Sequence, residues 1–298
     1  MNTRIVPNSE TKQGGVILAV GATGRATGSV VPALAGRGAR VRGLIRKPDQ
    51  AQGVLARGAA ETAVGNLADR ASVEATLQGV DAVFYVPPAA LADEAEAGSI
   101  MVNAAVRAGV RRFVFSSVIH PVLSGLHNHA AKAPVEEAVL ESGMEYTFLH
   151  PTVFYQNYAW SWPQITQTGV LAEPWSVQTR LSRVDYRDVA EAAAIALTTD
   201  RLLNGTFELA ADGGLDREQV AALIAGVLGR DIKAVRLDPA VLGDIPPWMR
   251  KMFEYYDRHA LLGNPLTLRA ILGREPRTLR TYFEELAAGQ PAAANPAH

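Results

Sequence analysis

The first half of the chain alternates short apolar runs with segments in which apolar residues recur at helical spacing. The apolar runs predict six strands, at Val16–Val20, Arg40–Ile45, Ala59–Val64, Asp81–Val86, Arg112–Ser117 and Met144–Leu149. The intervening segments predict helices, three of which end at Gly79, Gly109 and Gly143. Strands that alternate with helices over short links form a parallel sheet with helices on both faces. The pattern therefore predicts a doubly wound α/β fold.

The pattern changes after Pro151. Residues 152–179 are rich in aromatic residues, Gly and Pro and lack a regular period, as expected where the chain leaves the sheet to build a cap. A helix is then predicted at Arg187–Leu197 and a seventh strand at Thr206–Leu209. We expect a disordered leader at 1–13, a sheet domain at 14–152, a smaller α/β cap mainly at 153–290, from which about 180–210 returns to the sheet, and a disordered tail at 291–298.

Composition narrows the class of protein. The chain has 298 residues, 48% of them hydrophobic, and its dispersed charges sum to −1, so nothing indicates a nucleic-acid surface. No apolar run approaches the ~20 residues that span a bilayer, and the polar N-terminus does not resemble a signal peptide. The absence of cysteine excludes thiol catalysis, and the six histidines lack metal-ligand spacing, so no metal is expected. We expect a cytoplasmic monomer or homodimer.

A glycine-rich turn, Gly21-Ala22-Thr23-Gly24, follows the first predicted strand. A strand, a tight turn and a helix N-terminus together expose backbone N–H groups, which bind phosphate. Gly21 permits a turn conformation that other residues rarely adopt, and Gly24 leaves room for a pyrophosphate near the backbone. We therefore expect the turn to bind a dinucleotide, through Gly21, Thr23, Gly24, Arg25, Ala26 and Thr27.

The third glycine of such a turn is displaced by one residue here. Three residues after Gly24 the chain has Thr27, and Gly28 follows it. Either Gly28 allows the close packing of helix on strand that the third glycine normally permits, or the helix lies slightly further from the sheet.

The second predicted strand is followed by Arg46 and Lys47. Proteins that bind NAD usually carry Asp or Glu here for the ribose hydroxyls, whereas cations suit the 2′-phosphate of NADP. The alternative interpretation is that both are solvated surface charges. We expect NADP as the cofactor, with Asn66 and Leu67 beside the adenine and further contacts from Pro87 and Ser116.

Five segments follow one another in a recognisable order. They are Gly21-Ala22-Thr23-Gly24, Phe113-Val114-Phe115-Ser116-Ser117, Lys132-Ala133-Pro134-Val135-Glu136-Glu137, Tyr146-Thr147-Phe148-Leu149-His150-Pro151 and Val184-Asp185-Tyr186-Arg187-Asp188-Val189-Ala190. In this order they resemble the NmrA-like proteins, which are atypical short-chain dehydrogenases/reductases. The resemblance covers about residues 15–285 and implies a Rossmann fold, a small C-terminal domain and an NADP-type cofactor. It leaves the activity open, because the family includes quinone and azo-compound reductases, aromatic-substrate reductases and redox sensors without turnover.

Typical short-chain dehydrogenases use a Tyr-x-x-x-Lys pair, in which the lysine holds the nicotinamide ribose and the tyrosine donates a proton. Lys132 matches the lysine, but Asn128 stands at the tyrosine position. His127 or His129 could replace the donor because imidazole titrates near neutral pH, or both could be exposed loop residues. A further candidate is Tyr155, reaching in from the cap.

Similar proteins often have Arg where this chain has His150, so a charge contact there is either lost or made dependent on pH. The resemblance also implies that the next four residues, Pro151, Thr152, Val153 and Phe154, run past the nicotinamide.

These features predict an NADPH-dependent reductase that passes hydride to a quinone-like or conjugated apolar small molecule. Such an acceptor needs little acid assistance because the product anion is delocalised, and aromatic residues from Phe154 to Trp175 supply a flat, apolar wall. A helical stripe from Trp248 to Tyr256 is either core or part of that wall. The alternatives are a non-catalytic NADP(H)-binding redox sensor, and an NADP-dependent biosynthetic reductase or rearrangement enzyme.

Overall fold

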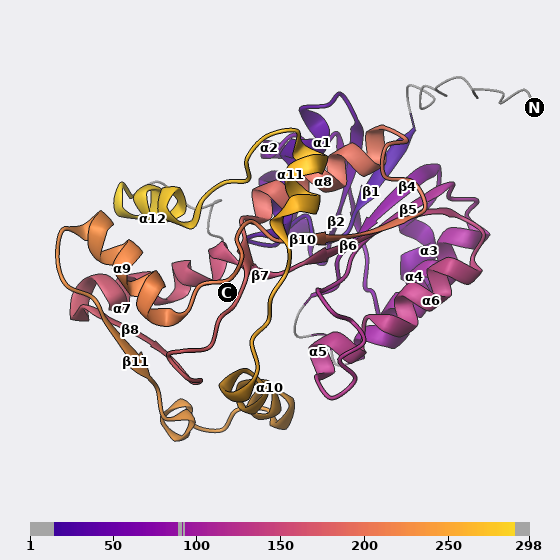
Figure 1. Cartoon of the computed structure of the whole chain (residues 1–298). Helices are drawn as coiled ribbons and strands as arrows, with labels where there is room; N and C mark the ends of the chain where they lie inside the picture. The colour runs from indigo at the N-terminus through magenta and orange to yellow at the C-terminus, as the bar shows by residue number, and fades with distance from the viewer. Residues whose placement is uncertain (1–14, 89–90, 92, 290–298) are drawn as a thin grey trace, which may run out of the picture.

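Seven parallel strands form the central sheet of the computed structural model, which describes residues 15–88, 91 and 93–289 (Figure 1). In spatial order they are β10 (Gly205–Leu209), β6 (Glu145–Pro151), β5 (Arg112–Ser116), β4 (Val80–Tyr85), β1 (Val16–Ala19), β2 (Arg40–Ile45) and β3 (Glu61–Val64). The predicted doubly wound α/β fold is confirmed, although β3 starts later than expected. The leader predicted at 1–13 and the tail predicted at 291–298 lie outside the described residues.

Successive residues of a strand face opposite layers of helices, because side chains alternate across a sheet. In β1, Ile17 and Ala19 face one core, whereas Val16 and Leu18 face the other. The first core is covered by α1 (Val30–Ala35), α2 (Ala51–Ala56), α8 (Tyr186–Thr198) and α11 (Pro265–Leu272), and the second by α3 (Arg70–Thr76), α4 (Glu94–Arg107) and α6 (Ala133–Glu141). Figure 1 shows these two layers on either side of the sheet.

The helix after the glycine turn starts later than the apolar spacing predicts. Apolar periodicity begins at Ala26, but a 3₁₀ turn, η1 (Thr27–Ser29), precedes α1. The hydroxyl of Thr27 donates to the carbonyl of Gly21 at 2.6 Å, a side-chain bond that competes with regular helical pairing. A second short 3₁₀ turn, η2 (Pro48–Gln50), leads from β2 into α2.

The cap has a helix where no regular period was predicted. After β7 (Val153–Phe154) and η3 (Tyr155–Asn157), α7 (Tyr158–Thr168) crosses the aromatic-rich segment with Pro163 inside it. Its buried residues Tyr158, Trp162 and Ile165 share one face, and Trp162 stacks on Phe283 with ring centroids 5.7 Å apart. Proline and polar residues between these positions obscured the helical period.

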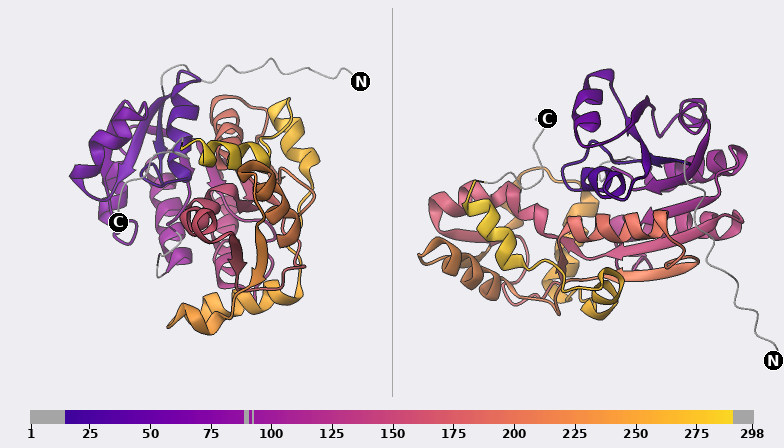
Figure 2. Two further views of the ribbon diagram at one scale, coloured as in Figure 1. Left: turned by 90° about the vertical axis from the view of Figure 1, so that its left-hand side faces the viewer. Right: turned by 90° about the horizontal axis from the view of Figure 1, so that it is seen from above.

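The rest of the cap packs around α7. Its elements are β8 (Val170–Glu173), α9 (Arg217–Leu228), β11 (Lys233–Arg236) and α12 (Leu279–Ala287), with β8 and β11 paired in parallel. The right-hand view in Figure 2 shows this group beside the sheet domain rather than over its helical layers.

A smaller cluster joins the sheet domain to the segments around α10. Ile119, which follows β5, packs with Leu181, Tyr256 and Leu261. The elements around this cluster are α5 (His127–Ala130), η4 (Pro239–Leu242) and α10 (Pro247–Arg258). The short strand β9 (Arg183–Val184) also lies here and pairs in parallel with β7. Tyr256 belongs to the helical stripe predicted as core or wall.

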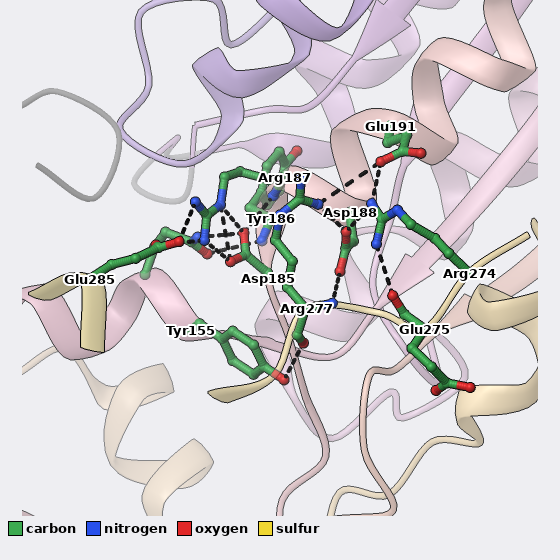
Figure 3. Close-up of polar contacts among 11 residues, drawn as sticks. Tyr155, Asp185, Tyr186, Arg187, Asp188, Glu191, Arg274, Glu275, Arg277 and Glu285 are labelled. Carbon is green, nitrogen blue, oxygen red and sulfur yellow. Dashed lines mark hydrogen bonds and ion pairs between the residues drawn. The ribbon is translucent and has the colours of Figure 1, made fainter. Parts of the chain in front are cut away.

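Two buried carboxylates at the N-terminus of α8 tie the cap and the C-terminal segment to the sheet domain (Figure 3). Asp188 accepts from the backbone N–H of Arg277 at 2.7 Å and from Nη2 of Arg274 at 2.8 Å, and it also pairs with Nη1 of Arg277. Asp185 accepts from the backbone N–H of Arg187 at 2.8 Å, capping α8. The guanidinium of Arg187 also reaches Glu285 of α12, with Nη2 2.8 Å from Oε2.

We expect Asp188→Asn to lower the free energy of unfolding by about 1–3 kcal/mol, because two arginines lose the charge that they share. Urea titration measures the loss, and limited proteolysis should show earlier cleavage near Arg274 and Arg277. The control is Glu191→Gln, which alters a partly exposed partner of Arg274 and should cost less than about 1 kcal/mol. Equal losses in the two variants would contradict this role for Asp188.

Candidate functional site

The glycine turn is held in shape by its own contacts. Gly21 has φ +86°, and a Cβ there would lie 2.5 Å from Cγ1 of Val86. A Cβ on Gly24 would lie 2.0 Å from the hydroxyl oxygen of Thr27, the group that bonds the Gly21 carbonyl. Both glycines are therefore required by the turn itself, and the turn leaves backbone N–H groups at the edge of the sheet where a dinucleotide phosphate would bind.

Gly28, the glycine displaced by one residue, allows the close packing that the third glycine of such a turn normally permits. A Cβ at Gly28 would lie 2.8 Å from the carbonyl oxygen of Ala22 and 2.0 Å from Nη1 of Arg57. That Nη1 donates to the carbonyl of Ala22 at 2.7 Å and lies 3.4 Å from the carbonyl of Gly24, so Arg57 supports the turn from behind. Burial lowers the pKa of Arg57. The sequence pattern gave no sign of this contact, because Arg57 follows α2, far along the chain from the turn.

Arg46 and Lys47 lie exposed at the end of β2, on the same edge as the glycine turn. Their backbone N–H groups both bond to Oε1 of Gln50, at 2.9 and 3.1 Å. Asp49 follows in η2, but within the described part of the chain neither cation forms an ion pair with it or with another carboxylate. Two positive charges therefore stand available for an anion at this point.

The other positions predicted for the cofactor differ in exposure. Asn66 is exposed after β3, where its Oδ1 accepts from the N–H of Ala68 at 3.1 Å, whereas Leu67 and Pro87 are buried. Ser116 is also buried, and its Oγ accepts weakly from the hydroxyl of Tyr186 at 3.5 Å. Ser116 therefore faces α8, and its predicted contact with the cofactor stays a prediction.

Arg25 joins the glycine turn to the cap. Its guanidinium carbon lies 3.8 Å from the ring centroid of Trp160 in α7, a cation–π contact. Trp160 is otherwise exposed. The sequence placed Arg25 beside the cofactor phosphates, and the structure adds that the same side chain contacts the cap.

A cavity of about 310 Å³ lies beyond the ends of β5 and β6, between the sheet domain and the cap. Pro151, Thr152, Val153 and Phe154, the segment predicted to pass the nicotinamide, form one side. The facing walls are largely aromatic and apolar, with Tyr158, Trp175, Leu181, Met252, Tyr256 and Leu261. Part of the stripe on α10 is therefore a cavity wall, and Ser117 rather than Ser116 borders the cavity.

His129 is a buried side chain that borders this cavity. Its Nδ1 lies 3.1 Å from the carbonyl oxygen of His120, and because a carbonyl can only accept, we assign the proton to Nδ1. Burial lowers the pKa of His129, and the positive charge of nearby Lys132 lowers it further. The ring is therefore mostly neutral at pH 7. Its Nε2 is then a bare acceptor with no hydrogen-bond partner in the described residues.

Two of the predicted proton donors do not reach the cavity. His127 is exposed and lies beside Trp248, with ring centroids 6.1 Å apart. Tyr155 is buried in the core of the cap, where its hydroxyl donates to the carbonyl of Arg277 at 3.2 Å (Figure 3). Burial raises the pKa of Tyr155. Asn128, at the position of the usual tyrosine, does border the cavity.

Lys132 forms an ion pair with Glu94, the first residue of α4. Both side chains are about one-tenth exposed. The carboxylate of Glu94 provides a contacting counter-charge for the ammonium group of Lys132 and fixes its side chain at the N-terminus of α6. Sequence reasoning missed Glu94 because the two residues lie on different helices and share no local pattern.

His150 keeps a charge contact in a form that depends on protonation. Its Nε2 lies 2.9 Å from Oε1 of Glu136, the oxygen that also accepts from the hydroxyl of Ser117. Because Ser117 borders the cavity, this chain of bonds connects His150 to the site. A protonated His150 can pair with Glu136 as an arginine would, whereas the neutral ring can only donate a hydrogen bond.

The described part of the chain offers neither a membrane-spanning helix nor a cluster of metal ligands. None of its helices has the length and apolarity needed to cross a membrane. It also holds no cluster of three or more His, Asp or Glu side chains suited to a metal ion.

Comparison with known proteins finds full-length relatives. The model of the NmrA-like family matches residues 13–286. An NAD(P)H azoreductase of Xenophilus azovorans is 29% identical over 300 residues, which cover 93% of this chain and 100% of the relative. A (4-alkanoyl-5-oxo-2,5-dihydrofuran-3-yl)methyl phosphate reductase of Streptomyces griseus is 30% identical over 285 residues, covering 91% and 97%.

Among solved structures, the NADPH-dependent quinone oxidoreductase QOR2 of Escherichia coli in complex with NADPH is similar to this chain, with a TM-score of 0.79. The sequences are 24% identical, and the alignment covers 91% of this chain and 99% of that protein. At this identity the likeness concerns the fold. The match of the family model over nearly the whole chain shows that the chain belongs to the NmrA-like family.

Proposed function

We propose that the chain is an NADPH-dependent reductase of conjugated, apolar acceptors such as quinones. The observation that carries the proposal is the arrangement along one edge of the sheet. The glycine turn and two cations lie toward one end, and an aromatic-lined cavity lies toward the other. Relatives that are an azoreductase and a quinone oxidoreductase support this assignment.

The residues present fit an NADP-type cofactor. Backbone N–H groups of the Gly21–Gly24 turn would hold the pyrophosphate, and Arg46 and Lys47 would hold the 2′-phosphate. The segment from Pro151 to Phe154 would flank the nicotinamide. When bound, the reduced cofactor supplies a hydride.

Lys132 acts in this proposal as a positioning residue rather than as an activator of an acid. No tyrosine stands at position 128, so the lysine has no phenol whose pKa it could lower. Its ion pair with Glu94 fixes the ammonium group at the N-terminus of α6, where it can donate to a ribose hydroxyl. Glu94 limits the motion of Lys132 and so keeps the donor in place.

The cavity favours flat, conjugated acceptors. Trp175 and Tyr256 meet edge to face, with ring centroids 5.5 Å apart, and both border the cavity together with Phe154. A planar ring can pack against these faces. Reduction of a quinone spreads negative charge over the ring system, so the reaction proceeds without a strong acid. This agrees with a neutral His129, whose single proton is donated to the carbonyl of His120.

The redox sensor is the second candidate function, and one contact favours it. Arg25 belongs to the turn that would bind phosphate and also stacks on Trp160 of the cap. A phosphate that draws Arg25 toward it would weaken this contact, so cofactor occupancy could change the position of α7. A reductase oxidises NADPH repeatedly with an acceptor, whereas a sensor binds NADPH without oxidising it.

The direct test is oxidation of NADPH by the purified chain with a panel of quinones and conjugated enones. We expect turnover with quinones to exceed turnover with simple ketones of similar size, because the delocalised product anion needs less acid. The absence of turnover with every acceptor, despite tight binding of NADPH, would favour the sensor.

Arg46→Ala should weaken NADPH binding by about tenfold or more, because charge-assisted hydrogen bonds to the 2′-phosphate are lost. NADH lacks that phosphate, so its affinity should hardly change. Calorimetric titration with both cofactors measures the difference. Arg40→Ala is the matched control, because Arg40 is an exposed arginine at the opposite end of β2. Equal affinity of the native chain for NADPH and NADH would overturn the assignment.

His129 should act as an acid only at low pH. Because its pKa is lowered, the protonated fraction at pH 7 is small and falls about tenfold for each further pH unit. For a ketone acceptor, turnover should therefore rise as pH falls through neutrality and level off only below about 6.5, and His129→Gln should abolish that rise. Quinone turnover should depend less on pH in both proteins.

The matched control for this experiment is His127→Gln, which alters the exposed neighbouring histidine and should leave the pH profile unchanged. A pH profile of the ketone reaction that is identical in native protein and His129→Gln would remove His129 as the acid.

A further inference from the structure

Arg183 is a buried cation that borders the cavity. It lies in β9, its residue is only 2% exposed, and its side chain belongs to the wall between Leu181 and Tyr158. Arginine stays protonated in proteins, so the cavity contains a permanent positive charge. The proposed function, an acceptor site for neutral conjugated molecules, makes no use of this charge.

The other two arginines that are almost fully buried have carboxylate partners, but Arg183 does not. Arg112 pairs with Glu145 at 2.8 Å and with Asp200 at 2.6 Å, and Arg217 pairs with Glu173 at 3.1 Å. Arg183 forms no ion pair with any carboxylate of the described residues. Its side chain donates from Nη1 to the backbone carbonyls of Leu181 at 2.8 Å and Leu215 at 3.0 Å, and it also interacts with the hydroxyl of Tyr158.

The nearest acids do not contact the guanidinium of Arg183, although Oδ2 of Asp212 is buried and has no hydrogen-bond partner in the described residues. Asp212 accepts through Oδ1 from the backbone N–H groups of Gly214, at 2.9 Å, and of Arg183, at 3.3 Å. Glu173 borders the cavity, but its Oε2 accepts from Nε of Arg217. These carboxylates stabilise the charge of Arg183 at a distance without contacting its guanidinium. Together with Tyr158 they raise the pKa of Arg183 despite its burial, so the guanidinium stays charged, and a ligand anion could supply the contacting counter-charge that no carboxylate of the described residues provides.

The surroundings of Arg183 supply further donors. Its guanidinium carbon lies 5.7 Å from the ring centroid of Tyr158, whose buried hydroxyl interacts with the guanidinium of Arg183 and still has its own proton to donate. Ser161, one turn further along α7, also borders the cavity. A guanidinium, a phenol and an alcohol at one end of an apolar cavity form a site for an oxyanion.

We propose that the natural acceptor is a conjugated molecule that carries an anionic oxo group, a carboxylate or sulfonate, and that Arg183 binds this group. The inference rests on the proposed reductase function and specifies its substrate class. The apolar walls hold the conjugated ring system, and the charge of Arg183 orients it from one end.

Steady-state kinetics with 1,2-naphthoquinone and 1,2-naphthoquinone-4-sulfonate test the proposal. Each variant is compared with the native chain on the same substrate, so the different reactivities of the two quinones cancel. Arg183→Met should lower kcat/KM for the sulfonate about tenfold to a hundredfold and for the unsubstituted quinone less than threefold. Arg183→Lys should recover part of the loss, because it keeps the charge.

Arg180→Met is the matched control. Arg180 lies in the same segment and bonds the carbonyl of Gly214, but it is exposed and does not border the cavity. It should leave the ratio of the two kcat/KM values unchanged. Equal losses on both quinones in Arg183→Met would show that Arg183 only supports packing. If Arg180→Met lowers the ratio of kcat/KM for the sulfonate to kcat/KM for the unsubstituted quinone as much as Arg183→Met does, the overall charge of the protein and not a site at Arg183 attracts the sulfonate.

Ligand binding to the native chain tests the anion site even if no quinone is turned over or if the Arg183 variants do not fold. Calorimetry with naphthalene-2-carboxylate and the equally shaped naphthalene-2-carboxamide should show at least tenfold tighter binding of the carboxylate. Equal or weaker binding of the carboxylate would overturn the anion site. If neither quinone turns over but the carboxylate binds more tightly, the reductase function fails while the anion site stands.

Discussion

The parallel pairing of all seven strands determines where function can occur in this protein. In a parallel sheet the carboxyl ends of all strands lie at the same edge, so the loops after β1, β2, β4, β5 and β6 all lie there. The glycine turn, the cations after β2 and the segment after β6 are distant in sequence but lie along that single edge. A cofactor and an acceptor placed there would meet end to end.

The edge becomes a closed site only because the cap is held in place. The cap has its own core around α7, α9 and α12, and its position relative to the sheet depends on polar contacts at the start of α8. Asp185 and Asp188 are buried where cap and sheet domain meet, so their charges require the arginines that the later segments provide. The same interactions that satisfy these carboxylates therefore position one wall of the cavity.

The polar groups of the cavity are unevenly satisfied, and this has chemical consequences. The neutral ring of His129 donates its one proton to a backbone carbonyl and leaves Nε2 without a partner in the described residues, whereas Arg183 carries a positive charge that no carboxylate of those residues contacts. Burial strengthens the electrostatic effect of each group, because little solvent is present to screen it. The site is therefore suited to acceptors whose charge complements these groups, more than to acceptors that need a strong acid.

Local sequence determined the seven strands of the sheet, most of the helices and the glycine turn, because alternation, helical spacing and glycine conformation are properties of neighbouring residues. The segment from Pro151 to Phe154, which borders the cavity, was expected near the nicotinamide from the resemblance to the NmrA-like proteins. Only the tertiary structure decided which side chains meet: it paired Lys132 with Glu94, placed Arg57 behind the glycine turn, and left Arg183 without a carboxylate. It likewise buried Tyr155 away from the site and His129 beside it. Such outcomes depend on contacts between elements far apart in the chain, whose partners no local pattern encodes.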